Sequence, residues 1–280
     1  MKNKKFLLLA LVLLLIAAFS LLRSRYGLMV TRYEVAIEEL NQPVRMVHLT
    51  DLHCMEFGSK NEKLVAAVSK QKPDIIAMTG DMISRDSSPE DVQSLCELVS
   101  TMAEIAPVYF SLGNHELMYM EAREDSLTSQ LAEAGAVILE QEFQDITVAG
   151  QPLRIGGAYG YLLSRKHQNT PEQDFMDAFT DTQNPTVLLA HLSEGLLAYN
   201  CLGDWNVDLV LSGHTHGGQI RLPLLGGLYD PEVGLFPKYT QGLFQDNGAY
   251  LVLSAGLGSS TRFPRFNNPP ELVVIDLAAA

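Results

Sequence analysis

The arrangement of apolar and polar positions separates an amino-terminal apolar segment from a long body. Residues 6–22 form an apolar run in which Ser20 is the one polar residue, and three lysines precede it. At ~1.5 Å per residue this run spans about 26 Å, near the ~30 Å hydrocarbon core of a bilayer. We predict that residues 1–27 form a single-pass membrane anchor. The alternative is a cleaved signal peptide, because Ala18, Phe19 and Ser20 offer small residues at a spacing that suits a signal peptidase.

The patterned body, residues 28–280, begins directly after the apolar run. Tyr33, Val35 and Ile37 alternate with polar residues, which is typical of a half-buried strand. A stalk rich in Gly, Ser and Pro is missing from the sequence between the two parts, so an anchored body is expected to lie against the membrane surface. Basic residues flank the apolar run on both sides and nearly balance. We expect the body outside the cytoplasm, with the short amino terminus inside.

In the body, apolar strands alternate with helical patterns in the first half, and strands dominate the second half. Strands are predicted at 45–50, 74–79, 107–112, 137–139, 186–190, 208–211, 250–253 and 272–275, with a hairpin at 146–155 that turns near Gly150. Helices are predicted at 61–72 with Ser59 as the cap, from Ser88 to about Glu104 with Pro89 in its first turn, and from the end of the third strand to Ala134. This order predicts one domain of the α/β (α+β) class, in which helices cover β-sheets.

Composition narrows the functional classes. The 280 residues include 20 basic and 33 acidic side chains, which gives a net charge of −13. Such an acidic chain is not expected to bind nucleic acid, because binding to the phosphate backbone requires clustered Lys and Arg. Three cysteines without a CxxC spacing indicate neither a disulfide framework nor a zinc ribbon.

Polar clusters follow five of the predicted strands directly. They are Asp51-Leu-His53, Gly80-Asp81, Gly113-Asn114-His115-Glu116, His191, and Gly213-His214-Thr-His216, and they hold five of the seven histidines. The carboxyl ends of strands are where ligands gather in open α/β sheets. In extended backbone, Asp51 and His53 project to the same side, as do His214 and His216. We therefore expect these side chains to converge.

The chemistry of these side chains indicates a metal site. Carboxylates, one carboxamide and several imidazoles, without a thiolate among them, suit Mn²⁺, Fe or Zn²⁺ better than Mg²⁺ or Ca²⁺. The set is larger than one tetrahedral ion needs, whereas two ions that share a carboxylate use all of it, an arrangement suited to displacement at phosphorus. The competing interpretation is polar strand ends hydrogen-bonded to loops. It is disfavoured because burying unpaired Asp and His side chains costs several kcal/mol.

Taken in order, these motifs resemble the calcineurin-like metallophosphoesterase family from about residue 44 to the end. The string Ser212-Gly-His-Thr-His-Gly-Gly-Gln-Ile220 and the tail from Gly256 to Glu271 resemble its membrane-associated bacterial branch, which is similar to UDP-diacylglucosamine hydrolases. The resemblance implies a two-sheet β-sandwich flanked by helices, with four layers in the order αββα. The sequence departs from the common family pattern at Ser84, where an acid is frequent, and at His191-Leu-Ser193, where the pattern often continues with Pro.

The resemblance also implies a role for each motif residue. One metal ion is expected on Asp51, His53, Asp81 and His216, and the other on Asp81 as the bridge, Asn114, His191 and His214. His115 is expected to stay off the metals as a general acid or as a donor to the developing charge. A hydroxide held between the ions would attack phosphorus.

The function implied is that of a dinuclear metal-dependent phosphoester hydrolase. We expect a phosphodiesterase or pyrophosphatase that acts on a membrane- or envelope-linked phosphoester. The alternatives are a phosphoprotein phosphatase and a membrane-tethered module that holds metals without catalysis.

Several residues outside the motifs allow two interpretations. Arg221, Arg262 and Arg265 either clamp a phosphate or form ordinary surface salt bridges. The apolar segment 222–228 either packs on the core or forms an acyl-chain wall or a lip at the bilayer. His48, within a predicted strand, is expected to be a satisfied core histidine, and His167 a solvated loop residue.

Overall fold

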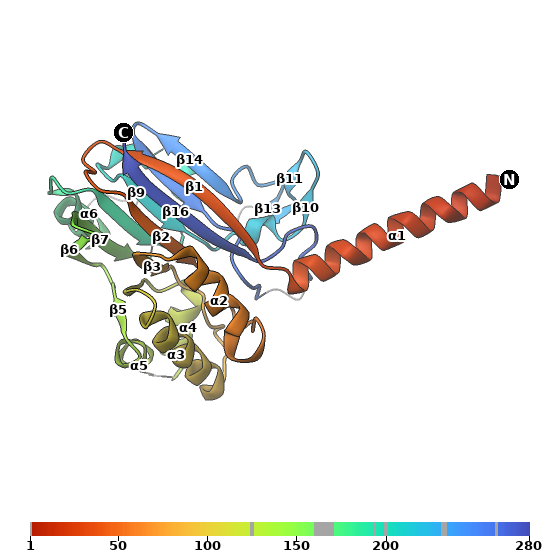
Figure 1. The fold of residues 1–280 in the computed structure, drawn as a ribbon, viewed down its shortest axis with the longest axis horizontal. Helices are drawn as coiled ribbons and strands as arrows, with labels where there is room; N and C mark the ends of the chain where they lie inside the picture. The colour runs from red at the N-terminus through yellow and green to blue at the C-terminus, as the bar shows by residue number, and fades with distance from the viewer. Residues whose placement is uncertain are drawn as a thin grey trace.

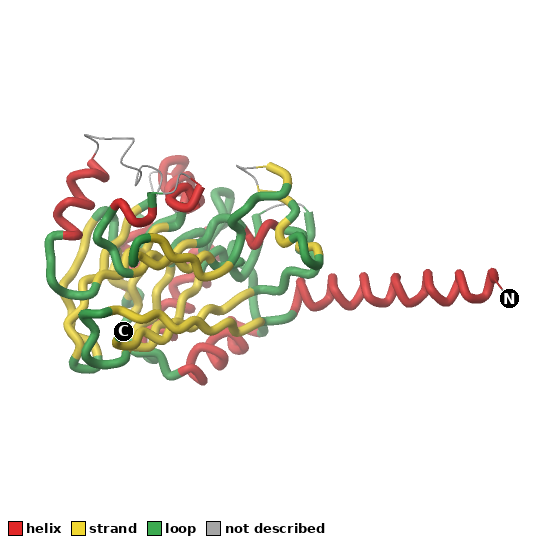
Figure 2. The backbone as a smooth tube through the Cα atoms, turned by 90° about the horizontal axis from the view of Figure 1, so that it is seen from above, coloured by secondary structure: helices red, strands yellow, loops and turns green. Residues whose placement is uncertain are grey.

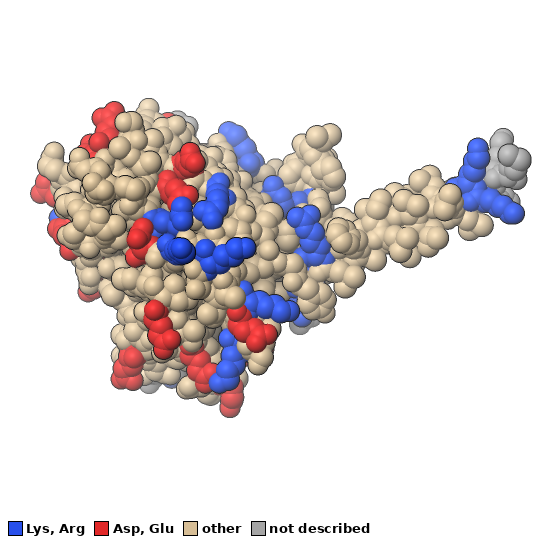
Figure 3. Space-filling view, viewed as in Figure 1, with Lys and Arg blue, Asp and Glu red and all other residues tan. Residues whose placement is uncertain are grey.

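The computed structural model shows a long amino-terminal helix that leads into a body with two sheets (Figure 1). It describes residues 2–123, 126–159, 171–192, 194–198, 201–230, 234–260 and 263–280. Helix α1 (Lys2–Tyr26) projects from the body in both ribbon views (Figures 1 and 2). Its segment Lys4–Tyr26 has a mean hydropathy of 2.7 and is long and apolar enough to cross a membrane, although a signal sequence has the same properties. Figure 3 shows the charged side chains of α1 only near its two ends.

The first sheet has six strands in the order β1-β16-β2-β3-β4-β5. Their bounds are β1 Met29–Ile37, β16 Glu271–Ala279, β2 Val44–Leu49, β3 Ile75–Met78, β4 Val108–Phe110 and β5 Ala136–Ile138. Strands β2 to β5 are parallel, β16 runs antiparallel to β2, and β1 runs parallel to β16. The first and last strands of the body are therefore neighbours, which places both ends of the body in one sheet.

The second sheet also has six strands, in the order β14-β15-β9-β8-β7-β6. Their bounds are β14 Gly242–Asp246, β15 Ala249–Leu253, β9 Leu209–Ser212, β8 Thr186–Ala190, β7 Gln151–Ala158 and β6 Glu142–Val148. The four central strands are parallel, and an antiparallel hairpin closes each edge. The predicted hairpin near Gly150 is one of these edges.

The two sheets face each other across an apolar core, and helices cover their outer faces. Met46 and Ile75 of the first sheet and Ile155 and Leu189 of the second belong to the core between the sheets. The helices are α2 Glu62–Gln71, α3 Pro89–Ala103, α4 Asn114–Arg123, α5 Leu127–Glu133, α6 Pro171–Thr180 and α7 Glu194–Ala198. The first four pack with the outer face of the first sheet, and α6 and α7 with that of the second. The predicted sandwich flanked by helices is thus confirmed.

Local capping agrees with the sequence at one helix and differs at another. At α3, the Ser88 hydroxyl accepts from the Asp91 N–H and the Asp91 carboxylate accepts from the Ser88 N–H, a capping box. The prediction that Ser59 caps the helix at 61–72 is wrong. Ser59 opens a separate 3₁₀ turn, Ser59–Asn61, and Lys60 and Asn61 take left-handed φ values of 50° and 59° before α2 starts. The single helix predicted to end at Ala134 is two helices, α4 and α5.

Two small hairpins were not predicted from the pattern because each strand has only two residues. They pair β10 (Arg221–Leu222) with β11 (Gly226–Gly227), and β12 (Tyr229–Asp230) with β13 (Gly234–Leu235). Strand β14 and helices α6 and α7 were also missed. The hairpins lie at the end of the body from which α1 projects (Figure 1).

Candidate metal centre

The loops at the carboxyl ends of five parallel strands bring the predicted ligands to one edge of the two sheets. Asp51 follows β2, Asp81 follows β3, and Asn114 opens α4 after β4. His191 follows β8 in the second sheet, and His214 and His216 follow β9. The convergence expected from the sequence is therefore present, and both sheets contribute to it.

The two-residue spacings suggested an extended backbone for these side chains, but the backbone that presents them is not extended. Asp51, His53, Asp81, His214 and His216 all have positive φ, between 47° and 73°. Such conformations cost about 1–3 kcal/mol each in non-glycine residues and persist where surrounding contacts enforce them. Here the Asp51 N–H donates to the Gly80 carbonyl at 3.0 Å, and the His53 N–H donates to the Asp81 carbonyl at 3.0 Å. The direction of these ligand side chains is therefore set by tight turns with left-handed residues and not by the alternation of a strand.

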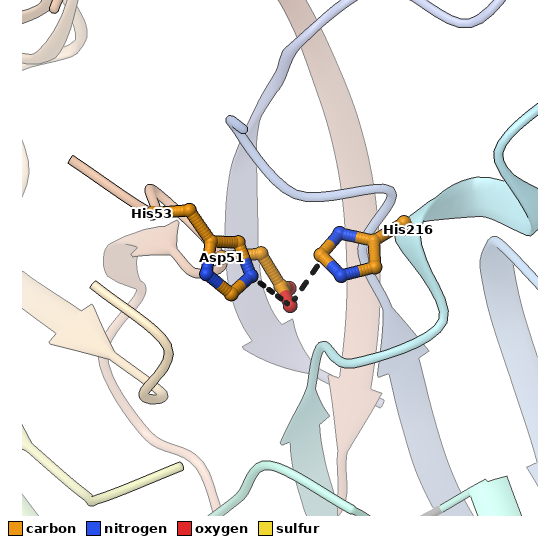
Figure 4. Close-up of side chains that lie close together, drawn as sticks. All are labelled: Asp51, His53 and His216. Atoms are coloured by element: carbon orange, nitrogen blue, oxygen red, sulfur yellow. Dashed lines mark ion pairs between the residues drawn. The ribbon is translucent and has the colours of Figure 1, made fainter. Parts of the chain in front are cut away.

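The first group of potential ligands is Asp51, His53 and His216 (Figure 4). Asp51 Oδ1 lies 4.0 Å from His53 Nε2 and 3.8 Å from His216 Nδ1. Both oxygens of Asp51 also accept from the His214 N–H at 3.1 Å. Because all three side chains are buried, the carboxylate is held in place and faces two imidazole nitrogens.

The second group is Asp81, His191 and His214. Asp81 Oδ2 lies 3.2 Å from His191 Nε2, and it lies 3.7 Å from His53 Nε2 in the first group. Asp81 is therefore the carboxylate between the two groups, the position that the resemblance implies for a bridge. Its other oxygen, Oδ1, accepts from the His115 N–H at 2.8 Å.

His115 lies at the edge of the cluster. Its Nε2 is 4.0 Å from Asp81 Oδ2, and its ring packs edge-on to His53 with centroids 4.8 Å apart. Its Nδ1 receives a hydrogen bond from the Arg85 N–H at 3.1 Å. Since a backbone N–H can only donate, Nδ1 accepts, and the proton of the neutral ring is on Nε2, which faces the cluster. His53, Asp81 and His115 also form a third group with metal-ligand spacing.

His191 is oriented in the opposite sense. Its Nδ1 lies 2.6 Å from the Thr79 carbonyl oxygen, so Nδ1 donates and Nε2 is the ring nitrogen that faces Asp81. On the other side of the cluster, Ser84 Oγ lies 3.3 Å from His53 Nδ1. Ser84, which departs from the common family pattern, thus contacts the nitrogen of His53 that does not face the carboxylates.

The charges in this pocket favour a cation. Burial lowers the pKa of His53 and His216 to about 3, so both rings are neutral, the form that binds metals. Burial also acts against a charged His191, but the carboxylates of Asp81, Asp51 and Glu116 outweigh it and raise the pKa of His191 to about 10. Burial acts to raise the pKa of Asp81, but the charge and hydrogen bond of His191 outweigh it and hold that pKa well below its usual range. The cluster therefore attracts positive charge in the form of protons or metal ions.

Four ligand-type atoms in the cluster lack a hydrogen bond within the described part of the chain. They are His53 Nε2, Asn114 Oδ1, His191 Nε2 and His216 Nδ1, all buried. Leaving such atoms unsatisfied costs about 1–3 kcal/mol each. Every one belongs to a predicted metal ligand, so the donor set fits divalent cations with nitrogen and oxygen ligands.

Glu116 is a residue whose role the sequence did not reveal, although it stands in a motif. Its carboxylate is buried and accepts from the N–H groups of Asp81, Met82 and Gly113 at 2.7, 2.7 and 2.9 Å, and from that of Ile83 at 3.3 Å. Burial first, and then the charge of Asp81, raise the pKa of Glu116 to about 7. Glu116 thus fastens the turn that carries Asp81 to the turn that carries Asn114.

Arg265 does not fit the clamp role considered for it. Its guanidinium is buried and donates to the carbonyls of residues 255, 256, 258, 268 and 269 and to Asn268 Oδ1. Those bonds use its donors, so it braces a loop. Asn268 in turn donates to the His216 carbonyl at 2.7 Å. Arg221 donates to the Gly217 carbonyl and to Thr240 Oγ1, and Arg262 lies outside the described residues.

The two histidines expected away from the metals have separate outcomes. His48 is fully buried in β2, and its Nε2 lies 2.7 Å from Thr79 Oγ1, as expected for a core histidine. Its Nδ1 has no hydrogen-bond partner among the described residues. His167 lies outside the described residues.

Comparison with known proteins connects this geometry to a family. The family model for calcineurin-like phosphoesterases matches residues 44–218. The metallophosphoesterase YkuE of Bacillus subtilis is 28% identical over 238 residues, covering 83% of this chain and 78% of the relative. The phosphodiesterase YaeI of Escherichia coli is 27% identical over 237 residues, covering 84% and 82%. Among solved structures, the sulfate thiohydrolase SoxB of Thermus thermophilus shares the fold at a TM-score of 0.50 and 15% identity, covering 83% of this chain and 56% of SoxB.

Proposed function

The chain belongs to the calcineurin-like phosphoesterase family, whose members hydrolyse phosphoester bonds with metal ions, and we propose that it is a dinuclear phosphodiesterase or pyrophosphatase. In this proposal Asp51, His53, Asp81 and His216 hold one divalent ion. Asn114, His191 and His214 hold the second, with Asp81 shared. Mn²⁺, Fe and Zn²⁺ are the ions that this donor set suits.

The observation that carries the proposal is the set of buried, unsatisfied ligand atoms on both sides of Asp81. The number of ions is supported by the two groups, one around Asp51 and one around His191, because each offers at least three ligand atoms of its own. A phosphodiesterase among the relatives supports the diester over the monoester as the substrate class.

The residues of the chain supply positioning and a hydrogen-bond donor. Bound divalent cations would neutralise the charge of the phosphate and provide a nucleophilic water at neutral pH. His115 presents its Nε2 proton to the cluster because the Arg85 N–H occupies Nδ1. Burial lowers the pKa of His115, with Asp81 acting in the opposite direction, and the lowered pKa favours the neutral ring. We assign His115 as a hydrogen-bond donor, through Nε2–H, to the charge that develops on the leaving-group oxygen.

A substrate panel tests this proposal. The full chain, purified in detergent and loaded with Mn²⁺, Zn²⁺ or Mg²⁺, is assayed with a chromogenic phosphodiester, the matching monoester and a phosphopeptide. We expect the diester to be the best substrate in Mn²⁺ or Zn²⁺. A preference for the phosphopeptide would instead identify a phosphoprotein phosphatase.

The variant His115→Ala separates catalysis from metal storage. Removing one hydrogen-bond donor to the developing charge typically lowers turnover by about 10²–10³-fold, so the variant should lose that much turnover and keep its metals. His167→Ala is the matched histidine control, since His167 is outside all the motifs. Unchanged turnover in His115→Ala would contradict the donor role of His115, and metal binding without turnover in the parent chain would indicate a binding module.

The location of the substrate is part of the proposal. An apolar helix joined to the body by two residues keeps the metal centre at the membrane surface, if the helix is retained. We propose that the substrate is a membrane- or envelope-linked phosphoester and that the body faces away from the cytoplasm. Protease added to intact spheroplasts should then degrade the body. Protection of the body until the spheroplasts are lysed would show that it faces the cytoplasm instead.

A further inference from the structure

A cavity connects the metal centre with the foot of α1. It has a volume of about 870 Å³, within the range of about 300–1,000 Å³ that small-molecule sites occupy. Its lining includes His53 and the three residues that follow it, which we call the inner end, and the last turns of α1, which we call the outer end. Gly258, Ser259 and residues 263–265 form a third wall. A predicted metal ligand and the apolar helix therefore share one cavity.

Hydrogen bonds hold this end of α1 against the body. The Ser24 hydroxyl is buried and accepts from the Asn268 N–H at 3.0 Å, and Ser20 accepts from the Asn267 N–H at 2.9 Å. Asn268 also donates to the His216 carbonyl. One residue thus contacts both the helix and the turn of a metal ligand, so the last turns of α1 are a fixed wall of the site.

The third wall is fastened to the same turn. Gln219, three residues after His216, donates through its side chain to the Phe263 carbonyl and accepts from the Ser259 hydroxyl at 3.1 Å. Phe263 nevertheless leaves its ring 69% exposed at the cavity. An exposed aromatic ring on a braced loop can contact an apolar ligand without first reorganising.

The cavity changes character from one end to the other. Its inner end carries His53, where a phosphate would meet the cations, together with Cys54, Met55 and the carboxylate of Glu56. Its outer end presents Leu21, Leu22, Tyr26 and Phe263, with Arg25 beside them. This gradient matches an amphiphile whose charged phosphate is followed by an aliphatic chain. A nucleotide or a phosphopeptide offers no aliphatic chain for the outer end.

The surroundings show where such a chain would come from. The segment Lys4–Tyr26 of α1 is about 35 Å long at ~1.5 Å per residue, and its large apolar side chains from Phe6 to Leu22 are exposed. The small hairpins lie at the end of the body from which α1 projects (Figure 1). Leu224, Leu225, Leu235 and Phe236, in or beside these hairpins, are exposed apolar side chains. A bilayer crossed by α1 would meet these side chains, and the outer end of the cavity would open at the level of the lipid chains.

We infer that this cavity is a binding subsite for the aliphatic chain of a membrane phosphoester, with the last turns of α1 as one wall. The inference rests on the proposed function and adds the substrate class to it: a lipid phosphodiester that stays partly in the bilayer during hydrolysis. Helix α1 is then a part of the substrate site as well as an anchor.

The test compares chain lengths in the full-length protein. The protein is placed in phosphatidylcholine nanodiscs with Mn²⁺ and assayed with methyl, octyl and dodecyl p-nitrophenyl phosphodiesters. Phe263→Asp introduces a charge into the cavity wall, and Tyr26→Asp does so from the helix. Phe236→Asp is the matched control, because Phe236 is a similarly exposed aromatic residue at the hairpins that does not line the cavity.

The subsite predicts a chain-length effect confined to the cavity variants. Each buried methylene is worth about four-fold, so loss of contact with two of them should lower the dodecyl-to-methyl ratio of kcat/KM by about fifteen-fold in Phe263→Asp and Tyr26→Asp. Phe236→Asp should keep the parent ratio. Partitioning of the long-chain ester into the disc acts on all variants alike, so the comparison between them isolates the cavity.

A binding readout separates this inference from the activity. A dodecyl phosphodiester that carries a diazirine on its chain is photolysed with metal-free protein, and the labelled peptides are mapped. Labels on residues 21–26, 53–56 or 263–265 support the subsite; labels confined to the hairpins or to the middle of α1 overturn it. Equal ratios in Phe263→Asp and Phe236→Asp also overturn it. If the parent chain hydrolyses none of the three esters, the proposed function is wrong, while the labelling still decides the subsite.

Discussion

Glu116→Gln tests whether one buried carboxylate holds the two halves of the metal centre together. The carboxylate accepts four backbone hydrogen bonds, two on each oxygen. A glutamine has the same shape, but only one oxygen can accept, and its amide group faces two N–H donors. Two N–H groups are then left unsatisfied at about 1–3 kcal/mol each, or about 2–6 kcal/mol in total.

The expected loss is large compared with a total stability of about 5–15 kcal/mol, but it allows folding. For a domain of this size, 1 kcal/mol shifts the Tm by about 2–4 °C, so a loss of 3 kcal/mol lowers it by about 6–12 °C. Because Asp81 and Asn114 lose their common support, metal affinity should fall by about 10–100-fold.

Thermal unfolding of the detergent-solubilised chain, with and without Mn²⁺, measures the first effect, and competition with a chromogenic chelator measures the second. Glu121→Gln is the matched control, an exposed glutamate in the same helix α4, and should change the free energy of unfolding by less than about 0.5 kcal/mol. If Glu116→Gln matches this control in both Tm and metal affinity, the assigned role of Glu116 is incorrect.

Three further predictions concern the close contact between Gly213 and Asp51, stabilisation by metal ions, and the pH dependence of stability. Gly213→Ala places a methyl group 2.4 Å from Asp51 Oδ2 and should displace that carboxylate. Competition with a chelator should then show at least ~10-fold weaker metal binding. Gly150→Ala is the control: its methyl group meets open space, so it should bind metal as the parent chain does. Adding Mn²⁺ or Zn²⁺ at 100 times the Kd should stabilise the metal-free chain by about 2.7 kcal/mol per site. The Tm should then rise by about 5–10 °C, and EDTA should reverse the rise. An unchanged Tm argues against the metal centre. Burial, with His191 adding to it, lowers the pKa of His48 to about 3. The unfolded chain therefore binds a proton below pH ~6.5 that the folded chain excludes, and stability falls by up to about 1.4 kcal/mol per pH unit from there towards pH 3. In urea titrations at pH 7, 6 and 5, His48→Gln should reduce this slope, and an identical slope would contradict the buried neutral state.

Much of the candidate site was predictable because metal ligation depends on side-chain chemistry and on local pattern. Asp51, Asp81 and His191 each follow an apolar strand directly, and strand ends of a parallel sheet meet at one edge. Likewise, Ser88 and Pro89 define the start of α3 through contacts within four residues. Ligand positions at strand ends and a helix start can therefore be predicted from a few neighbouring residues of the sequence.

The roles that were missed depend on contacts between distant segments. Glu116 binds N–H groups more than thirty positions away, and Asn268 links the turn of His216 to Ser24 of α1. The polar side chain of neither residue reveals its partner, because backbone donors and acceptors are the same in every residue. The element pattern likewise could not show that Ser59 precedes two left-handed residues, nor that short strands form hairpins beside α1.

What the sequence determined by itself is the inventory: the ligand types, their order along strand ends, and an apolar segment long enough to span a bilayer. What only the tertiary structure decided is how this inventory is oriented. The ring orientations of His115 and His191 are set by the Arg85 N–H and the Thr79 carbonyl, and the cavity exists because α1 packs beside the loop of His53. The physical reason is that chemical identity belongs to each side chain, whereas its direction and protonation are set by the non-local groups packed against it.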